Sequence, residues 1–176
     1  LRSELQAALS TSTATLQRAI DQLMREGFLR STRGAGTFVT DRPPHVAHFG
    51  LLFSAAPGGE GDNEYWPPMY HALLAVTTKV EQALDCRIHP YFNITGHSDE
   101  EDLRRLVRHV RHHRLAGLVV GEPHMLDRVA ALQEMALPRV TFTRGGVPDD
   151  GTLVVEPDYD TWFAAALDHL RSRGRR

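Results

Sequence analysis

The chain has 176 residues, of which 41% are hydrophobic, and its formal net charge is −2. That length suits one ordinary domain, or a small domain with part of another, and the apolar content excludes wholesale disorder. A near-neutral charge excludes a uniformly basic nucleic-acid binder, and no apolar run approaches the roughly 20 residues of a membrane span. The charge is uneven, however, because residues 1–42 carry six arginines and four acidic residues, while the rest sums to −4. A mildly basic first region on an acidic remainder fits a region that meets phosphate.

Residues 1–42, called the head below, begin with two expected helices. Apolar positions recur at helical spacing in 3–9 and again in 13–26. Either Ser10 or Ser12 can cap the second helix, because a hydroxyl oxygen accepts from its free N–H groups. Gly27 is a natural residue to end that helix. The chain starts inside the first helix without a Met, which indicates truncation at the amino end.

A hairpin and a stiff linker are expected next. Phe28 and Leu29 predict a short strand, 37–40 predicts a second one, and a turn covers Arg33–Gly36. A nucleotide-binding glycine loop would open a helix, but here prolines 43 and 44 follow the second strand. The glycines are therefore interpreted as turn residues that adopt positive φ.

Two helices joined by a tight polar turn and followed by a hairpin are the elements of a winged helix-turn-helix. In such a unit the second helix fits the major groove of double-stranded DNA, and the hairpin tip reaches phosphate or the minor groove. The residues predicted to contact DNA are Ser12, Thr13, Thr15, Gln17, Arg18, Arg33, Gly34, Gly36 and Thr37. Two alternatives stay open: Ser12 or Thr15 could merely cap the helix, and the whole unit could bind protein.

Residues 3–39 resemble the GntR family of bacterial repressors. The positions that match the family pattern in register are Glu4, Leu5, Leu9, Ser12, Thr15, Ala19, Leu23, Gly27, Gly34, Gly36, Thr37, Phe38 and Val39. The chain departs from it at Ser3, Thr13 and Gln17, where the family often has arginine. The resemblance implies a DNA-binding head, residues 1–42, from which the family's first helix is missing.

Residues 46–176, called the body below, alternate expected strands with expected helices. Strands are predicted within 45–55, 86–94, 115–121, 137–143 and 152–157. Helices are predicted within 66–84, 99–113, 124–136 and 158–174. This alternation predicts a parallel sheet wrapped by helices, a Rossmann-like α/β lobe. A ligand of such a sheet sits beyond the carboxyl ends of its strands.

The end of the body, "VVEPDYDTWFAAALDHLRSRGRR", resembles the LacI/GalR effector domain, which is itself similar to periplasmic sugar-binding proteins. The matching positions are Val155, Asp158, Ala166, His169, Leu170, Gly174 and Arg176. "LAGLVVG" and "LPRVTFTR" resemble two further strands of that family. The resemblance implies the first lobe and the start of the second lobe of a two-lobed sensor, so the carboxyl end is also expected to be truncated. A GntR-type head on such a sensor, as in arabinose repressors, implies a sugar-controlled repressor that is a homodimer when full length.

Sugars offer hydroxyl groups and an apolar ring face, which suit charged or amide side chains and an aromatic ring. The candidate effector-binding residues are Asn63, Glu64, Tyr65, Trp66, Arg144 and Asp158. Three of them have a structural alternative: Trp66 could pack in the core, Arg144 could form a surface salt bridge, and Asp158 could cap the last helix.

The sequence offers no catalytic or metal-binding constellation that we favour. His109 and His113 have the spacing of two zinc ligands on a helix, but no third ligand is evident, so a solvated charged face is preferred. No G-x-S-x-G motif presents a nucleophile. We therefore expect no enzyme activity, no metal and no cofactor. Cys86 is the only cysteine, which excludes an internal disulfide and, with no signal peptide, favours a cytoplasmic setting. The alternative to a regulator is a sugar-binding module that does not bind DNA in this truncated form.

Overall fold

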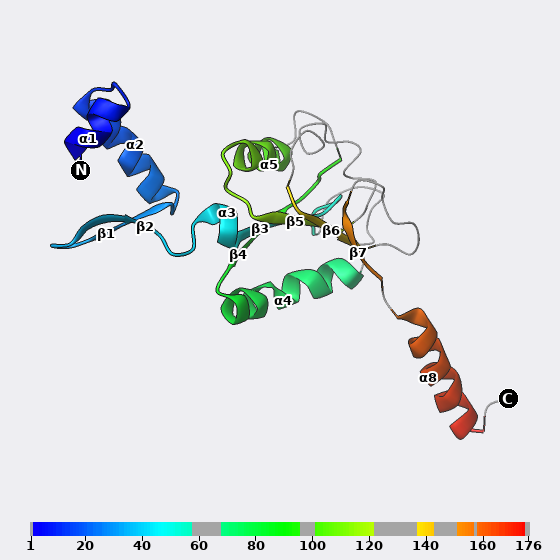
Figure 1. Cartoon of the computed structure of the whole chain (residues 1–176). Helices are drawn as coiled ribbons and strands as arrows, with labels where there is room; N and C mark the ends of the chain where they lie inside the picture. Colours follow the sequence, from blue (N-terminus) through cyan, green and yellow to red (C-terminus); the bar gives the residue numbers. More distant parts are fainter. Residues whose placement is uncertain are drawn as a thin grey trace.

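Two β-sheets organise the computed structural model, which describes residues 2–57, 68–95, 101–121, 137–142, 151–156 and 158–174. The head contains a two-stranded antiparallel sheet, and the body contains a five-stranded parallel sheet (Figure 1). The prediction of an α/β protein with a parallel sheet is confirmed. No described helix is both long and apolar enough to cross a membrane.

The head consists of α1 (Arg2–Ala8), α2 (Thr13–Arg25), β1 (Leu29–Thr32) and β2 (Gly36–Val39). Ser12 is the N-cap of α2, which decides between the two serines that the sequence offered. Gly27 follows the C-cap with φ +83°, a conformation that glycine adopts at little cost. The strands pair with Leu29 opposite Val39. Local sequence signals therefore account for most of the head.

The linker folds back into a helical turn before the body begins. Helix α3 (Pro44–Ala47) is a single turn, and β3 (His48–Leu52) follows it directly. The strand predicted from residue 45 therefore begins three residues later, because Pro44 suits the first turn of a helix, where its missing N–H is not needed. Pro43 and Pro44 are both buried, so the linker is packed rather than free.

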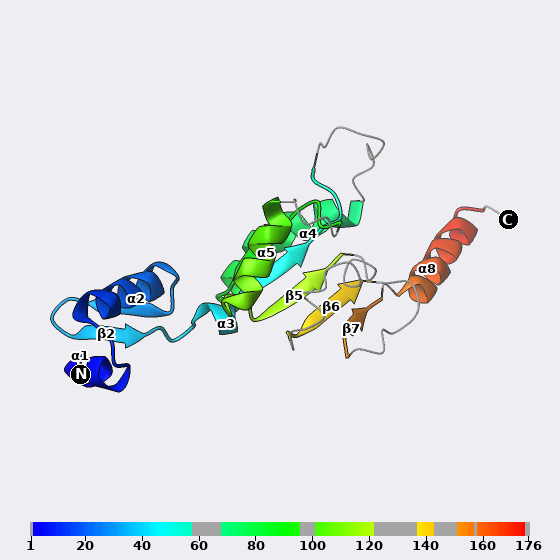
Figure 2. The ribbon, with the colours of Figure 1, turned by 90° about the horizontal axis from the view of Figure 1, so that it is seen from above.

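The body sheet has the order β4-β3-β5-β6-β7 and is parallel throughout. The strands that join β3 are β4 (Arg87–Tyr91), β5 (Gly117–Val120), β6 (Arg139–Phe142) and β7 (Leu153–Val155). Helices α4 (Pro68–Leu84) and α5 (Glu101–Arg111) cover opposite faces of the sheet (Figures 1 and 2). The chain turns from β4 back across β3 to β5, so the strand order reverses between β3 and β5. Ligands of open α/β sheets bind at such a reversal, beyond the carboxyl ends.

The core of the body forms on both faces of this sheet. On the α5 face it consists of Leu52, Tyr91, Ile94, Leu103, Leu106, Val110, Leu115, Leu118 and Val120. On the α4 face, Leu51, Phe53 and Tyr70 form a smaller cluster. The neighbours Leu51 and Leu52 serve opposite faces because side chains alternate along a strand. Burial on both faces explains why residues 49–52 of β3 and the whole of β5 are continuous apolar runs.

Helix α8 (Tyr159–Ser172) leads away from the body sheet (Figure 1). Its aromatic side chains are exposed, with Trp162 at 66% and Phe163 at 59%. The helix nevertheless has its own N-terminal cap, because Thr161 N–H donates to Asp158 Oδ1 at 3.0 Å. The capping alternative for Asp158 is thus what the structure contains.

Candidate functional site

The amino-terminal end of α2 carries five of the side chains predicted to contact DNA. Thr15 N–H donates to Ser12 Oγ at 3.2 Å, and the two hydroxyl oxygens lie 2.9 Å apart. Thr13 donates through its hydroxyl to Gln6 at 3.2 Å. These bonds hold the start of α2 to α1 and leave its hydroxyl groups at an exposed surface. A hydroxyl in such a bond keeps a lone pair for a further partner.

The next turn of α2 contains Gln17 and Arg18, the other two of these five side chains. Gln17 is half-buried, and its amide donates to Asp21 Oδ1 at 2.7 Å. Arg18 is exposed and forms no ion pair with any acid among the described residues. The guanidinium of Arg18 is therefore the charge on this surface that is most available to a phosphate.

The hairpin tip is an exposed turn between β1 and β2. Gly34 and Gly36 have φ values of +79° and +116°, and Ala35 N–H donates to Thr32 O at 3.0 Å. The predicted positive φ of both glycines is confirmed. Arg33 is exposed and unpaired within the described part of the chain, whereas Arg30 lies 3.6 Å from Asp41. Thr37, the last predicted contact, is half-buried at the start of β2.

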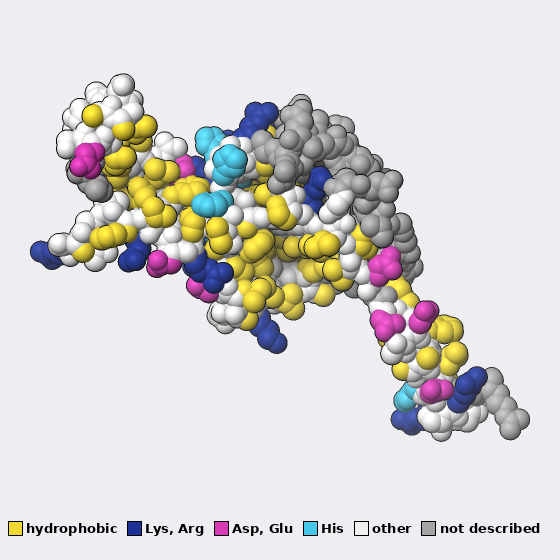
Figure 3. Space-filling view, in the orientation of Figure 1, with side chains coloured by type: hydrophobic (Ala, Val, Ile, Leu, Met, Phe, Trp, Pro, Cys, Tyr) yellow, Lys and Arg dark blue, Asp and Glu magenta, His cyan; other side chains and the backbone are white. Residues whose placement is uncertain are grey.

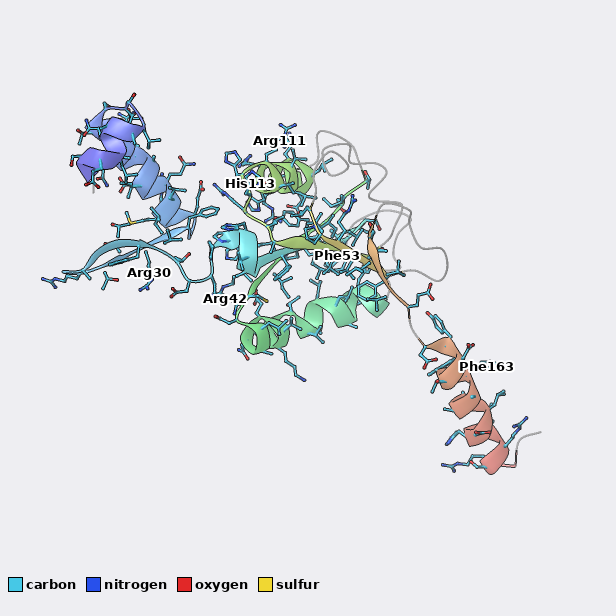
Figure 4. All side chains as sticks on the ribbon, in the orientation of Figure 1. Arg30, Arg42, Phe53, Arg111, His113 and Phe163 are labelled. Carbon is cyan, nitrogen blue, oxygen red and sulfur yellow. The ribbon has the colours of Figure 1, made fainter. Side chains whose placement is uncertain are left out.

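The carboxyl edge of the body sheet holds an aromatic cluster that the sequence did not single out. The ring of Phe53 lies 4.8 Å from that of Tyr70 and 5.5 Å from that of Phe92, centroid to centroid. Phe53, which lies among the crowded side chains of the body in Figure 4, and Tyr70 are fully buried, so neither ring offers an open stacking surface. Two polar side chains stand at the same edge: Ser54 Oγ lies 3.4 Å from the Tyr70 hydroxyl, and Asn93 is exposed with φ +55°.

Most of the predicted effector contacts lie outside the described residues, namely Asn63, Glu64, Tyr65, Trp66 and Arg144. The remaining one, Asp158, is described and fully exposed. Its hydrogen bonds from Thr161 lower the pKa of the carboxyl group, which is what a helix cap does to an acid. Its role in binding an effector stays a prediction.

Histidine side chains gather at the end of the body that faces the head (Figure 3). His89 Nε2 lies 3.2 Å from His48 Nδ1, and the rings of His89 and His109 are 6.0 Å apart. His109 Nδ1 lies 2.6 Å from the buried hydroxyl of Tyr91, so the solvated face favoured for His109 is wrong. Burial, followed by the nearby charge of Arg114, lowers the pKa of His109 to about 4. Among the described residues, no three His, Cys, Asp or Glu side chains are placed to hold a metal ion.

A polar crevice of about 400 Å³ lies where the linker meets α4 and β4. Arg42, His48, Gln82 and Arg87 line it, and Arg42 lies 3.6 Å from Asp85 across its mouth. Cys86 also lines it and is buried, and this burial raises the pKa of its thiol, as expected of an unreactive cysteine. Sequence reasoning missed this crevice because its walls come from the linker and from α3, β3, α4 and β4, which are separate in the sequence.

Comparisons of this chain with protein-family models, with curated proteins and with solved structures find no match. The functional conclusion therefore depends on two surfaces. One is the exposed end of α2 together with the hairpin tip, and the other is the carboxyl edge of the sheet. In Figure 2 the head lies at one end of the structure, and the strands of the body sheet run away from it, so that their carboxyl edge is on the side of the body far from the head.

Proposed function

We propose that this chain is a transcriptional repressor whose head binds operator DNA and whose body binds a small-molecule effector, with a sugar as the effector class. The head would be a winged helix-turn-helix of the GntR type, and the body a LacI/GalR-type lobe. The observation that carries the proposal is the pairing of an exposed, capped helix start with an arginine at a glycine hairpin tip. A parallel sheet with a strand-order reversal supports the effector half.

In this mechanism α2 lies in the major groove with its amino-terminal turn at the base edges. The free N–H groups of that turn favour a nearby phosphate, and Arg18 adds a positive charge one turn later. Arg33 reaches a phosphate or a narrow minor groove from the hairpin tip. Thr13 and Thr15 would offer hydroxyl groups to bases, which are weaker contacts than the bidentate pairs that arginine makes with guanine.

The effector would sit beyond the carboxyl ends of β3 and β5, where the strand order reverses. Ser54 and Asn93 supply polar groups there, above the buried rings of Phe53 and Tyr70. A sugar needs several directed hydrogen bonds, so we expect residues 63–66 and Arg144 to complete the site. No enzyme activity is part of the proposal.

A second candidate is a sugar-binding module that does not bind DNA. The bonds from Thr13 to Gln6 and from Gln17 to Asp21 favour it, because they occupy side chains that would otherwise meet bases. Exchanging an internal hydrogen bond for one to DNA yields little net free energy. The two candidates differ in whether duplex DNA binds at all.

Fluorescence anisotropy with a labelled duplex, at several salt concentrations, separates the two candidates. The probe is the best binder selected from random duplexes. We expect Arg33→Ala to weaken binding and to reduce the slope of log K against log salt by about 0.9, the value for one lost phosphate contact. Arg173→Ala, at the far end of α8, is the matched control that leaves the slope unchanged. Unaltered binding by Arg33→Ala and Thr15→Ala at every salt concentration would show that this surface does not meet DNA.

A thermal-shift screen with pentoses and hexoses tests the effector half. A sugar that binds only the folded state stabilises it by about 2.7 kcal/mol when its concentration is 100 times its Kd. We expect one class of sugar to raise Tm in proportion to the logarithm of its concentration. Equal and negligible shifts for all of them would remove sugar as the effector class.

A further inference from the structure

Two helix carboxyl termini meet where the head joins the body. Gly27, two residues after the end of α2, has φ +83°, and His113, two residues after the end of α5, has φ +52°, each in the left-handed region that closes a helix. Glu26 immediately precedes the first of these residues, and Arg114 immediately follows the second. The guanidinium of Arg114 donates to the carboxylate of Glu26 and forms an ion pair with it. The contact joins residues 88 positions apart in the chain.

The placement of Glu26 is unfavourable within its own helix. The carboxyl end of a helix carries a partial negative charge, so a carboxylate there is repelled, whereas a cation is attracted. Arg114 brings that cation to the ends of α2 and α5 at once. Secondary structure alone gives no reason for an acid at this position, and the ion pair across the junction does.

Other hydrogen bonds hold the carboxylate of Glu26 and the backbone of both partners. Glu26 N–H donates to Gln22 O at 2.9 Å, and the Gln22 amide donates to the Glu26 carboxylate at 2.9 Å. Arg114 N–H donates to His109 O at 2.8 Å, which closes α5. The next residue, Leu115, is buried. Because the Glu26 carboxylate and the backbone of Arg114 are already positioned, the pair loses less side-chain entropy when it forms than an ordinary surface pair does.

Burial also separates this ion pair from the others near the junction. The side chains of Glu26 and Arg114 are 12% and 26% exposed, whereas those of Arg42 and Asp85, which also join head and body, are 47% and 86% exposed. Water and salt screen the exposed pair strongly and the shielded pair much less. Of the two ion pairs that join head and body among the described residues, Glu26–Arg114 is therefore the better shielded and the one that can resist a rotation of the head.

A second set of contacts lies next to the ion pair. The ring of Phe28 stacks on that of His45, with 5.8 Å between centroids and 15° between planes. The Thr40 hydroxyl donates to Gly27 O at 2.9 Å, so the chain leaves the head beside the end of α2. Pro44, which is buried, lies against Gly27. Stacking and prolines limit how far the linker bends, and the ion pair selects one orientation within that range.

We propose that the Glu26–Arg114 ion pair is an orientation lock that holds the head in one fixed pose against the body. In that pose α2 projects its amino-terminal end away from the body (Figures 1 and 2). The consequence for DNA rests on the proposed function: in a dimer, two locked heads would accept operator half-sites at a single spacing. Arg114 is a positioning residue, since it would act on DNA only through the pose of α2.

Distance measurements between spin labels test the lock without any DNA. The labels occupy Arg33→Cys at the hairpin tip and Lys79→Cys on α4, in a Cys86→Ala background. We expect one narrow distance distribution for this chain. Arg114→Gln should at least double its width, and the reversed pair, Glu26→Arg with Arg114→Glu, should narrow it again.

The control for the distance experiment is Arg30→Gln, which removes an exposed ion pair within the head and should leave the width unchanged. Circular dichroism of each variant checks that the helices persist, and recovery in the reversed pair shows that a broad distribution is not a folding failure. A distribution as narrow in Arg114→Gln as in the unsubstituted pair would overturn the lock. A distribution that is already broad before Arg114 is substituted would overturn it equally.

The DNA consequence is tested by selection from a library of duplexes whose paired half-sites are separated by variable spacers. We expect the unaltered chain to enrich one spacing and Arg114→Gln to enrich several. Equal spacer tolerance of both proteins would refute the spacing role. If the unaltered chain enriches no duplex, the proposed function fails, while the distance distributions still decide whether the lock exists.

Discussion

Acid should destabilise this protein before its carboxylates titrate, because His109 is held in its neutral form. Its pKa falls to about 4, first because the ring is partly buried and then because Arg114 and His89 lie near it. An unfolded chain has a histidine pKa of about 6.5, so between pH 6.5 and 4 the unfolded state binds more protons than the folded state. The stability that comes from keeping His109 neutral is therefore fully present above pH 6.5 and is lost as the pH falls toward 4.

The size of this loss follows from the shift in the pKa of His109. Each unit of pKa difference corresponds to about 1.4 kcal/mol, so the full interval gives an upper bound near 3.4 kcal/mol. His109 is only half-buried, and solvent screening reduces the effect. We therefore expect about 1–2 kcal/mol from this side chain between pH 7 and pH 4.5. The pKa values of His48 and His89 are also lowered, mainly by burial, and add losses of the same sign.

Urea unfolding at four pH values between 7.5 and 4.5 measures the effect. His109→Gln keeps a hydrogen-bonding group beside Tyr91 but cannot be protonated, so its free energy of unfolding should fall about 1–2 kcal/mol less than that of the unaltered protein. His112→Gln changes an exposed histidine in the following turn and should leave the pH dependence unaltered. Parallel curves for the unaltered protein and His109→Gln would refute the assignment of the loss to His109.

Three further substitutions test local features. Ser12→Ala removes the cap of α2 and should lower stability by about 1 kcal/mol in thermal unfolding, while an unchanged Tm would mean that Thr15 N–H finds another acceptor. A Cβ at Gly50 would lie 2.7 Å from Leu118 Cδ2, so Gly50→Ala should lower the free energy of unfolding by about 1–3 kcal/mol. Urea unfolding measures this change, and an unchanged free energy would show that Leu118 moves aside without loss of stability. Asp158→Asn keeps a capping side chain on α8 but removes the charge, so we expect an unchanged Tm and weaker stabilisation by a bound sugar. Undiminished stabilisation by sugar would leave Asp158 with the capping role alone.

Features that depend on neighbouring residues were predictable from the sequence. The cap at Ser12, the helix end at Gly27 and the glycine turn between β1 and β2 all follow from the conformations that single residue types prefer. The position of β5 was predictable for a related reason, since a strand buried on both faces is a continuous apolar run. The first strand was misplaced at its start because a proline-initiated helical turn looks locally like a linker.

Contacts between distant residues were not predictable. Nothing near Glu26 in the sequence points to Arg114, and nothing in "RHVRHHR" distinguishes the half-buried His109 from its exposed neighbours. Helical spacing gives part of the answer in retrospect, because Leu106 and Val110 place His109 beside the buried face of α5. The partner of His109, Tyr91, lies on another element and follows only from the fold.

The positions of the two candidate surfaces constrain how one could affect the other. The head contacts the amino-terminal ends of β3 and β5, through His45 and Arg114, whereas the expected effector edge lies at their carboxyl ends. The strands between are tightly packed, since a Cβ at Gly121 would lie 2.9 Å from Tyr70 Cε1 and 3.1 Å from Leu52 O. Such a sheet transmits a displacement by moving as a unit rather than by bending. An effector that shifts β5 relative to α5 would therefore act on Arg114, which lies between them, and so on the ion pair that holds α2.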